Sequence, residues 1–172
     1  MRRPSSFKVD WRKRAAFFII ALLVVFVDQL GKLWVELNLA VGESIPETGF
    51  LRLTHIRNTG ASFGLFQDQT LVLAIVSIIG IGILLYLIFF MYRRLPFLST
   101  TPVKISLGLI LGGMAGNLID RLSSGYVTDF IDFSFWPAFN VADSAAVVGA
   151  VILAYSLLCL ARRDELSDGK DT

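Results

Sequence analysis

The stretch FNVADSAAVVGAVILAYSLLCLA (139–161) decides the fold. From Ala145 onward it reads as a membrane-crossing helix, and a hydrocarbon core needs about 20 such residues. It opens, however, with Asn140 and Asp143, two polar residues at the point where hydrocarbon should begin. A second acidic run, GYVTDFIDF (125–133), lies just upstream. The sequence therefore raises the question of what carboxylates do at the mouth of a membrane helix.

The composition is that of a membrane protein. Of the 172 residues, 55% are hydrophobic, which is too apolar for an ordinary soluble domain. Four stretches are long enough to span a bilayer, near 15–35, 71–92, 103–122 and 141–161. The first follows basic residues, as a signal peptide would, but its apolar run is too long and no small-residue cleavage site follows. We expect one all-α, polytopic, membrane-embedded domain over residues 1–172.

The basic residues indicate the orientation. Most of the 16 Lys and Arg residues precede span one, separate spans two and three, or follow span four. By the positive-inside rule those regions are cytoplasmic, so both termini lie inside. The net charge of +2 then reflects topology, and we expect no nucleic-acid partner. The segment 162–172 is expected to be a cytoplasmic tail, disordered over its final residues DELSDGKDT.

The segments outside the membrane differ in character. The segment 38–69 is too long for a simple turn, and SIPETGFLRLTHIRN within it joins a Pro-Glu-Thr-Gly turn signal to a short alternating run. We expect a small extracytoplasmic β-hairpin or curled sheet there. The segment 123–139 is expected to be a short loop that returns to the membrane.

Small residues line spans three and four. Gly108, Gly112 and Gly116 are four apart and form one stripe on span three, and span four has a similar face of alanine and glycine. Such stripes let helix backbones approach closely. We therefore expect spans three and four to pack together, which brings their polar ends near each other.

Polar residues within the spans gather at the ends expected to lie outside. They are Asp28 and Lys32 in span one, Asn117, Asp120 and Arg121 in span three, and Asn140 and Asp143 in span four. A charged group at the bilayer centre costs about 2.5–3.5 kcal/mol on insertion scales, and less near the ends. Charges at the same depth on three helices predict one shared polar pocket.

Structural interpretations compete with a functional one. Asp28 and Lys32, spaced i,i+4, are most simply an ion pair, and we favour that over a catalytic role. Asn140 fits the N-cap of span four, and Asp143 three residues later suits the positive end of the helix dipole. Buried hydrogen bonding would equally account for Asn117 and Arg121. Each of these explanations suffices for its own residue. Two acidic clusters that flank one short loop, however, favour a functional site.

Two carboxylates within hydrogen-bonding reach cannot comfortably both ionise, so they share a proton and can act together as base and acid on an amide. The partner of Asp143 could be Asp129 or Asp132, and the spacing leaves this open. With Cys159 and His55 the only residues of their types, no thiolate metal site or H-E-x-x-H motif can form. The sequence GASFG (60–64) matches G-x-S-x-G, a motif that needs a strand–turn–helix context and a histidine partner. We interpret it as a chance match, because the sole histidine, His55, lies seven residues upstream of Ser62 in the same small segment.

Four motifs in order resemble bacterial lipoprotein signal peptidase, or signal peptidase II. They are DQLGK (28–32), RNTGASF (57–63), GGMAGNLIDRLSSGYVTDFIDF (112–133) and FNVADSAAVVG (139–149). The resemblance implies an aspartic peptidase with four transmembrane helices and a small extracytoplasmic β-domain. It implies cleavage of prolipoproteins on the amino side of an S-diacylglyceryl-modified cysteine, in the bacterial cytoplasmic (inner) membrane with the site near the outer face.

Mapped by motif, the resemblance implies that Asp129 and Asp143 are the catalytic pair. It places substrate-binding or supporting roles at Asn58, Gly60, Asn117, Arg121 and Asn140, and a scaffold role at Asp28 and Lys32. We expect a monomer in contact with membrane lipids, without metal or cofactor. The alternative is a small proton- or ion-coupled transporter, but the inner halves of the spans are almost wholly apolar and offer no relay. A scaffold protein would leave the polar cluster unexplained, and presenilin-like proteases would require G-x-G-D, which the sequence lacks.

Overall fold

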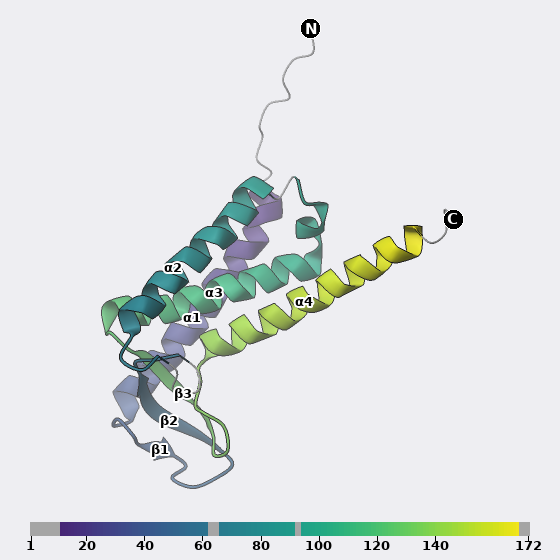
Figure 1. The fold of residues 1–172 in the computed structure, drawn as a ribbon. Coiled ribbons are helices and arrows are strands. Elements are labelled where there is room, and N and C mark those ends of the chain that lie inside the picture. Colours follow the sequence, from purple (N-terminus) through teal and green to yellow (C-terminus); the bar gives the residue numbers. More distant parts are fainter. Residues whose placement is uncertain (1–10, 62–65, 92–93, 169–172) are drawn as a thin grey trace.

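A computed structural model describes residues 11–61, 66–91 and 94–168 (Figure 1). The long helices are α1 (Trp11–Asn38), α2 (Thr70–Tyr86), α3 (Thr101–Ser123) and α4 (Val141–Asp168). A π-helical segment η2 (Leu87–Met91) extends α2, and a 3-10 turn η3 (Pro96–Ser99) precedes α3. The strands are β1 (Ser44–Ile45), β2 (Leu51–Asn58) and β3 (Val127–Phe133).

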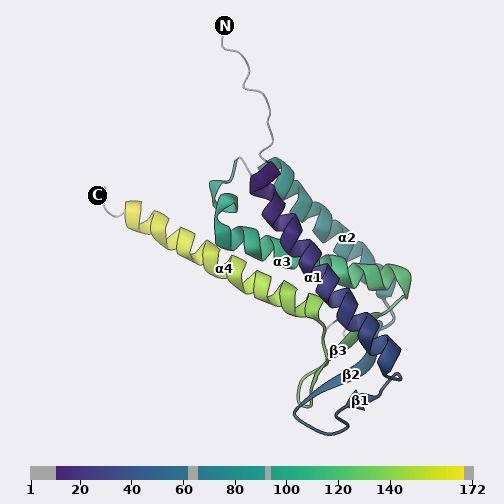
Figure 2. The same cartoon turned by 180° about the vertical axis from the view of Figure 1, so that it is seen from behind.

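In the part of the chain that the structure describes, four helices are long and apolar enough to cross a membrane. Their spans are Ala15–Asn38, Thr70–Met91, Thr101–Ser123 and Val141–Arg162. The strands form a small sheet at one end of the helices, and the described ends of the chain lie toward the other end (Figures 1 and 2). The predicted fold class, four transmembrane helices with a small β-rich segment, is therefore confirmed.

Helix α4 continues further than the sequence analysis expected. We expected disorder over the last residues from Asp164, but α4 is helical through Asp168. The segment after the apolar span, ARRDELSD (161–168), is rich in residues with high helix propensity. It contains neither proline nor glycine before Gly169, so nothing in it interrupts a helix that has already formed.

The sheet takes its third strand from a segment expected to be a loop. Its order is β1-β2-β3, and both pairs are antiparallel. Strands β1 and β2 come from the segment predicted to be β-rich, whereas β3 comes from the segment between spans three and four. After β3 the chain turns back, and Phe139 pairs with Ile131 on the free edge of β3. The start of α4 is thereby tied to the sheet.

Glycines let α3 approach two other helices closely. A Cβ on Gly113 would lie 2.3 Å from the backbone oxygen of Ala142, so α3 and α4 meet as predicted. The predicted stripe faces mainly α1, however. A Cβ on Gly108 or Gly112 would strike α1 at 2.7–3.0 Å, and one on Gly116 would lie 2.8 Å from Asp28 of α1 and 3.1 Å from Ala142 of α4. Helix α3 therefore packs against α1 on one side and α4 on another.

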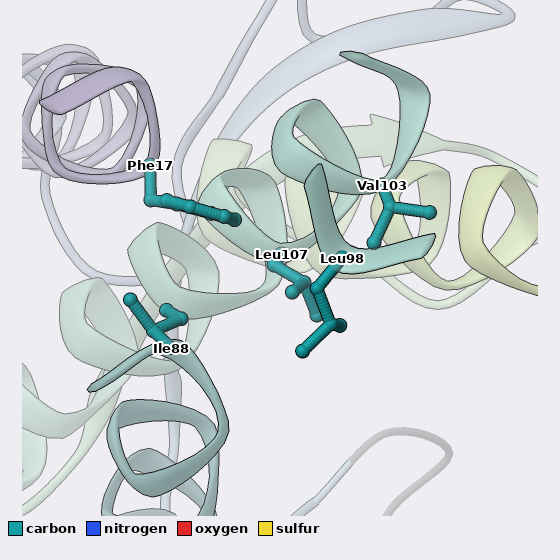
Figure 3. Packing of buried hydrophobic residues seen from close by; sticks show 5 residues of the cluster. All are labelled: Phe17, Ile88, Leu98, Val103 and Leu107. Carbon is teal, nitrogen blue, oxygen red and sulfur yellow. The ribbon is translucent and has the colours of Figure 1, made fainter. Parts of the chain in front are cut away.

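An apolar cluster closes the end of the bundle away from the sheet. Figure 3 shows its side chains from α1, η2, η3 and α3, which are Phe17, Ile88, Leu98, Val103 and Leu107. Each is at most 3% exposed. Apolar packing joins the helices at this end, and the buried charged groups of the described residues lie toward the sheet end.

Candidate active site

A groove of about 810 Å³ opens where the sheet meets the ends of α3 and α4. Its polar lining includes Asn58 and Asp129 from the sheet, Asn117 and Arg121 from α3, and Asp143 from α4. Its apolar lining includes Val147 and Val148 of α4, which are exposed on that helix. The groove thus joins a polar end to a surface that would face lipid. The sequence predicted a pocket shared by three helices; polar residues of α3 and α4 line this groove, whereas Asp28 and Lys32 of α1 do not.

The local chain path brings Asp129 and Asp143 to the same groove. Asp129 lies in β3, and the pairing of Phe139 with Ile131 returns the chain alongside that strand. Helix α4 begins two residues later, at Val141, and Asp143 lies in its first turn. A strand, a tight return and one helical turn therefore suffice to place both carboxylates at the groove.

Asn140 caps α4 and binds both carboxylates. Its side-chain oxygen accepts the backbone N–H of Asp143 at 2.9 Å, and its own backbone N–H donates to Asp143 Oδ2 at 3.3 Å. This reciprocal pair is a capping box with aspartate in the place of glutamate. The Asn140 Nδ2 donates to Asp129 Oδ1 at 2.8 Å. Asn140 is therefore the N-cap of α4, as the capping interpretation expected, and it also contacts both carboxylates.

Two further asparagines present N–H groups to the carboxylates. Asn58 Nδ2 donates to Asp129 Oδ2 at 2.8 Å, and Asn117 Nδ2 donates to Asp143 Oδ1 at 2.7 Å. The backbone N–H of Gly60 binds the Asn58 oxygen at 2.9 Å, and Lys32 Nζ binds the Asn117 oxygen at 3.0 Å. Because both of these partners are donors only, they fix which end of each amide faces the carboxylate.

Asp129 is buried, with only 2% of its surface exposed. This burial disfavours the carboxylate form and, with repulsion from Asp143, raises the pKa of Asp129 from 3.8 to about 7. Hydrogen bonds from Asn58 and Asn140 act in the opposite direction, because they stabilise the ionised form. At neutral pH this carboxyl can therefore hold or release a proton, which a general acid or base requires.

Arg121 connects α3 to the segment after β2. Its Nη2 donates to the backbone oxygen of Gly60 at 3.1 Å. Its Nε is buried and has no hydrogen-bond partner in the part of the chain that the structure describes. Buried N–H groups are normally paired, so this donor beside the groove is available to a ligand.

A buried ionic cluster lies behind the groove. Lys32 is 3% exposed, and its Nζ lies 2.7 Å from Asp28 and 2.6 Å from Asp120. The ion pair expected from the i,i+4 spacing is present, whereas the bond to Asp120 was not anticipated. Asp120 also accepts a hydrogen bond from Gln29 at 2.7 Å. Only the tertiary packing of α1 on α3 could reveal these contacts, because no local spacing relates the two helices.

Asp132, the other acidic residue of β3, is directed elsewhere. It accepts hydrogen bonds from Arg52 at 2.5 Å and Thr54 at 2.9 Å, both on β2. Side chains alternate between the two faces of a strand, so residues 129 and 132 stand on opposite faces. Asp132 therefore stabilises the sheet and does not line the groove. Ser62 lies outside the described residues.

The described residues contain no group of three or more His, Cys, Asp or Glu side chains that could hold a metal ion. The groove instead offers two carboxylates, those of Asp129 and Asp143, together with side-chain amides and two guanidinium groups, those of Arg57 and Arg121. Such a set can polarise a carbonyl, activate a water molecule and protonate a leaving group.

The chain is similar to known proteins over most of its length. A sequence profile of the family described as Signal peptidase (SPase) II matches residues 20–159. The lipoprotein signal peptidase of Dehalococcoides mccartyi strain BAV1 is 47% identical over 135 residues, covering 78% of this chain and 84% of that protein. That of Moorella thermoacetica is 45% identical over 145 residues, covering 83% and 92%.

The fold is also similar to a solved bacterial membrane enzyme. That structure, determined by the in meso method at 2.3 Å resolution, superposes with a TM-score of 0.75 at 30% identity, over 84% of this chain and 88% of the other. The profile match begins within the first span, ends within the fourth, and includes the two middle spans and the sheet. The resemblance inferred from the motifs is confirmed, and this chain belongs to the signal peptidase II family, a family of membrane proteases.

Proposed function

We propose that this protein removes the signal peptide from prolipoproteins and cuts on the amino side of the S-diacylglyceryl-modified cysteine, with Asp129 and Asp143 as its catalytic pair. The observation that carries the proposal is the convergence of both carboxylates on one groove, joined by Asn140. The names of the relatives support the substrate class.

The pair acts with one shared proton. In this proposal Asp129 carries it, since burial and repulsion from Asp143 raise its pKa to about 7, and Asp143 is the ionised partner that accepts the N–H groups of Asn117 and Asn140. Asp143 takes a proton from water as the water oxygen attacks the scissile carbonyl carbon. Asp129 gives its proton to the carbonyl oxygen, and a neutral tetrahedral diol results.

The second step reverses both proton transfers. Asp143 gives its proton to the amide nitrogen as the carbon–nitrogen bond breaks. Asp129 recovers a proton from a hydroxyl of the diol, which becomes the new carboxyl group of the signal peptide. The leaving amine is the new N-terminus of the lipid-modified cysteine. Both carboxyls return to their starting states.

The supporting residues hold the carboxylates and the substrate. Asn58, Asn117 and Asn140 fix the orientation of the two acids, as their hydrogen bonds require. The free Nε of Arg121 is suited to a backbone carbonyl of the substrate, and Gly60 holds that arginine in place. Binding of the lipid and the signal helix then fixes the scissile amide against the acids.

The groove lies at the outer face of the membrane in this proposal. Basic residues flank the opposite ends of the helices, and by the positive-inside rule those ends are cytoplasmic. A lipid-modified cysteine stays near the headgroups, where water can reach the scissile amide. The proton- or ion-coupled transporter considered from the sequence gains no support, because the buried charged groups of the described residues lie toward the sheet end.

The test compares aspartate variants of the purified protein on a synthetic diacylglyceryl-modified prolipoprotein peptide, with product masses measured. Asp129→Asn and Asp143→Asn should each lower kcat by at least about 10³-fold, since each removes an acid–base group. Asp132→Asn is the matched control on the same strand and should retain cleavage. Turnover at the unmodified rate by either groove variant would refute the pair. A product cut elsewhere would refute the proposed cleavage site.

A further inference from the structure

One face of α1 touches both of the elements that carry the proposed catalytic carboxylates. Asp28, Lys32 and Glu36 are spaced four residues apart, so they lie along one face over about 12 Å of helix. Asp28 Oδ1 accepts the backbone N–H of Ala142 at 2.8 Å. Glu36 Oε1 accepts the hydroxyl of Thr128 at 2.6 Å.

The two residues held by α1 immediately precede the two acids. Ala142 precedes Asp143 in the first turn of α4, and Thr128 precedes Asp129 in β3. Both anchored residues are buried, with Ala142 0% and Thr128 1% exposed. Asp28 thereby fixes the backbone next to Asp143, and Glu36 fixes the Thr128 side chain next to Asp129.

Strand geometry explains why an anchor at Thr128 orients Asp129. Neighbouring side chains of a strand point to opposite faces, so Thr128 and Phe130 face α1 while Asp129 faces the groove. Phe130 packs with Val35 and Leu39 of α1. At Gly31 of the same helix, a Cβ would lie only 2.7 Å from the Phe130 ring. The residues on both sides of Asp129 are therefore held by α1.

Lys32 lies between the two anchors and is bonded to Asp28 and Asp120. Asp120 also accepts the backbone N–H of Thr128 at 3.4 Å. The polar groups of α1 thus form a connected set that reaches both acids without either acid taking part.

We propose that Glu36 and Thr128 are a positioning pair, which with the Asp28 bond to Ala142 lets one face of α1 set the spacing of the two acids. This inference rests on the proposed function, because it assigns a task to residues that act through Asp129. Neither Glu36 nor Thr128 lines the groove. Their effect must therefore be on the chemical step and not on substrate binding.

A double-mutant cycle on the full-length protein in detergent tests the pair, with the lipidated peptide as substrate. Thr128→Val keeps the side-chain shape and removes the donor, and Glu36→Leu removes the acceptor. Each should lower kcat about tenfold, because a small displacement of a catalytic group slows the reaction by such factors. KM should stay within about twofold, and the double variant should be no slower than the single variants.

Conservative variants separate positioning from folding. Thr128→Ser and Glu36→Gln keep a donor and an acceptor and should restore kcat to within about threefold of the parent. Thr54→Val is the matched control, since it removes a buried, hydrogen-bonded hydroxyl from β2 without touching α1. It should leave kcat within about twofold. If Thr128→Val or Glu36→Leu unfolds, Thr128→Ala or Glu36→Ala, which also removes the hydrogen bond, takes its place with the same expected fall in kcat.

The outcomes are distinct from those for the catalytic pair. If Asp129→Asn is inactive but Thr128→Val turns over at the parental rate, the positioning pair is refuted and the catalytic pair stands. The same conclusion follows if the losses of kcat caused by Thr128→Val and by Glu36→Leu multiply in the double variant. A rise in KM without a fall in kcat would also refute it. If Asp129→Asn keeps full activity, the proposed function itself fails.

Discussion

The side-chain amide of Asn140 donates to Asp129 at 2.8 Å from the capping position of α4. The same residue accepts the N–H of Asp143 in the first turn of the helix. The same side chain, that of Asn140, therefore caps α4 and links Asp129 to Asp143. The polar residues at the start of this membrane helix terminate its backbone hydrogen bonding and place an acid at the groove.

The rate of cleavage should depend on pH through Asp129. Its pKa is raised from 3.8 to about 7 by burial and by Asp143, so the protonated form is lost as pH rises through 7. In our mechanism that form is the acid, so kcat/KM should fall about tenfold per pH unit well above 7. Initial rates on the lipidated peptide between pH 5 and 9 check this. A rate that stays constant to pH 9 would contradict the assignment.

Asn58→Ala provides an internal control for the pH profile. The hydrogen bond from Asn58 lowers the pKa of Asp129, so its removal should raise that pKa. The alkaline decline should therefore move to higher pH, even though the maximal rate is lower. A shift toward lower pH would show that a different group is being titrated.

Lys32→Met should destabilise the protein strongly. The substitution leaves Asp28 and Asp120 buried together without their cation. Loss of one partner of a buried ion pair costs about 3–5 kcal/mol. Denaturant unfolding in detergent measures this. Arg57→Met, at an exposed arginine stacked 4.6 Å from the Tyr126 ring, is the control and should cost about 0.5–1 kcal/mol.

Gly113→Ala should separate α3 from α4. The new Cβ would lie 2.3 Å from the backbone oxygen of Ala142, and backbone cannot rotate away as a side chain can. We expect a loss of about 2 kcal/mol or more in unfolding free energy, because overpacking forces the helices apart. Cleavage should also slow, since Asp143 follows Ala142. Thermal unfolding and peptide cleavage measure the two effects.

Gly82→Ala is the matched control for that prediction. Nothing lies within 4 Å of a Cβ at this position of α2. The same substitution should therefore be neutral there, or stabilising by up to about 1 kcal/mol through helix propensity. Equal losses at the two positions would show that packing at Gly113 is not the cause.

Ser62→Ala should retain cleavage within about twofold, since the proposed mechanism uses water as nucleophile and needs no serine. Its match to G-x-S-x-G is a chance match in our interpretation. The variant is assayed beside Asp143→Asn on the same peptide. Complete loss of cleavage by Ser62→Ala together with an active Asp143→Asn would favour a serine mechanism.

The sequence by itself determined the membrane architecture. Four apolar stretches of spanning length can exist in a hydrocarbon core only as helices, so their number and approximate places follow from composition. The cap at Asn140 is equally local, because its bonds to Asp143 lie within one helical turn. The ion pair of Asp28 with Lys32 follows from i,i+4 spacing.

Only the tertiary structure decided which acid faces the groove. The spacing of residues in the sequence did not decide whether Asp129 or Asp132 is the partner of Asp143, and the family resemblance favoured Asp129. The segment proved to be strand β3, whose alternation turns Asp129 toward the groove and Asp132 toward Arg52. That strand forms because β2 supplies its hydrogen-bonding partner from far along the chain. The contact of Glu36 with Thr128 likewise depends on how α1 crosses the sheet, and no local pattern encodes such a long-range pairing.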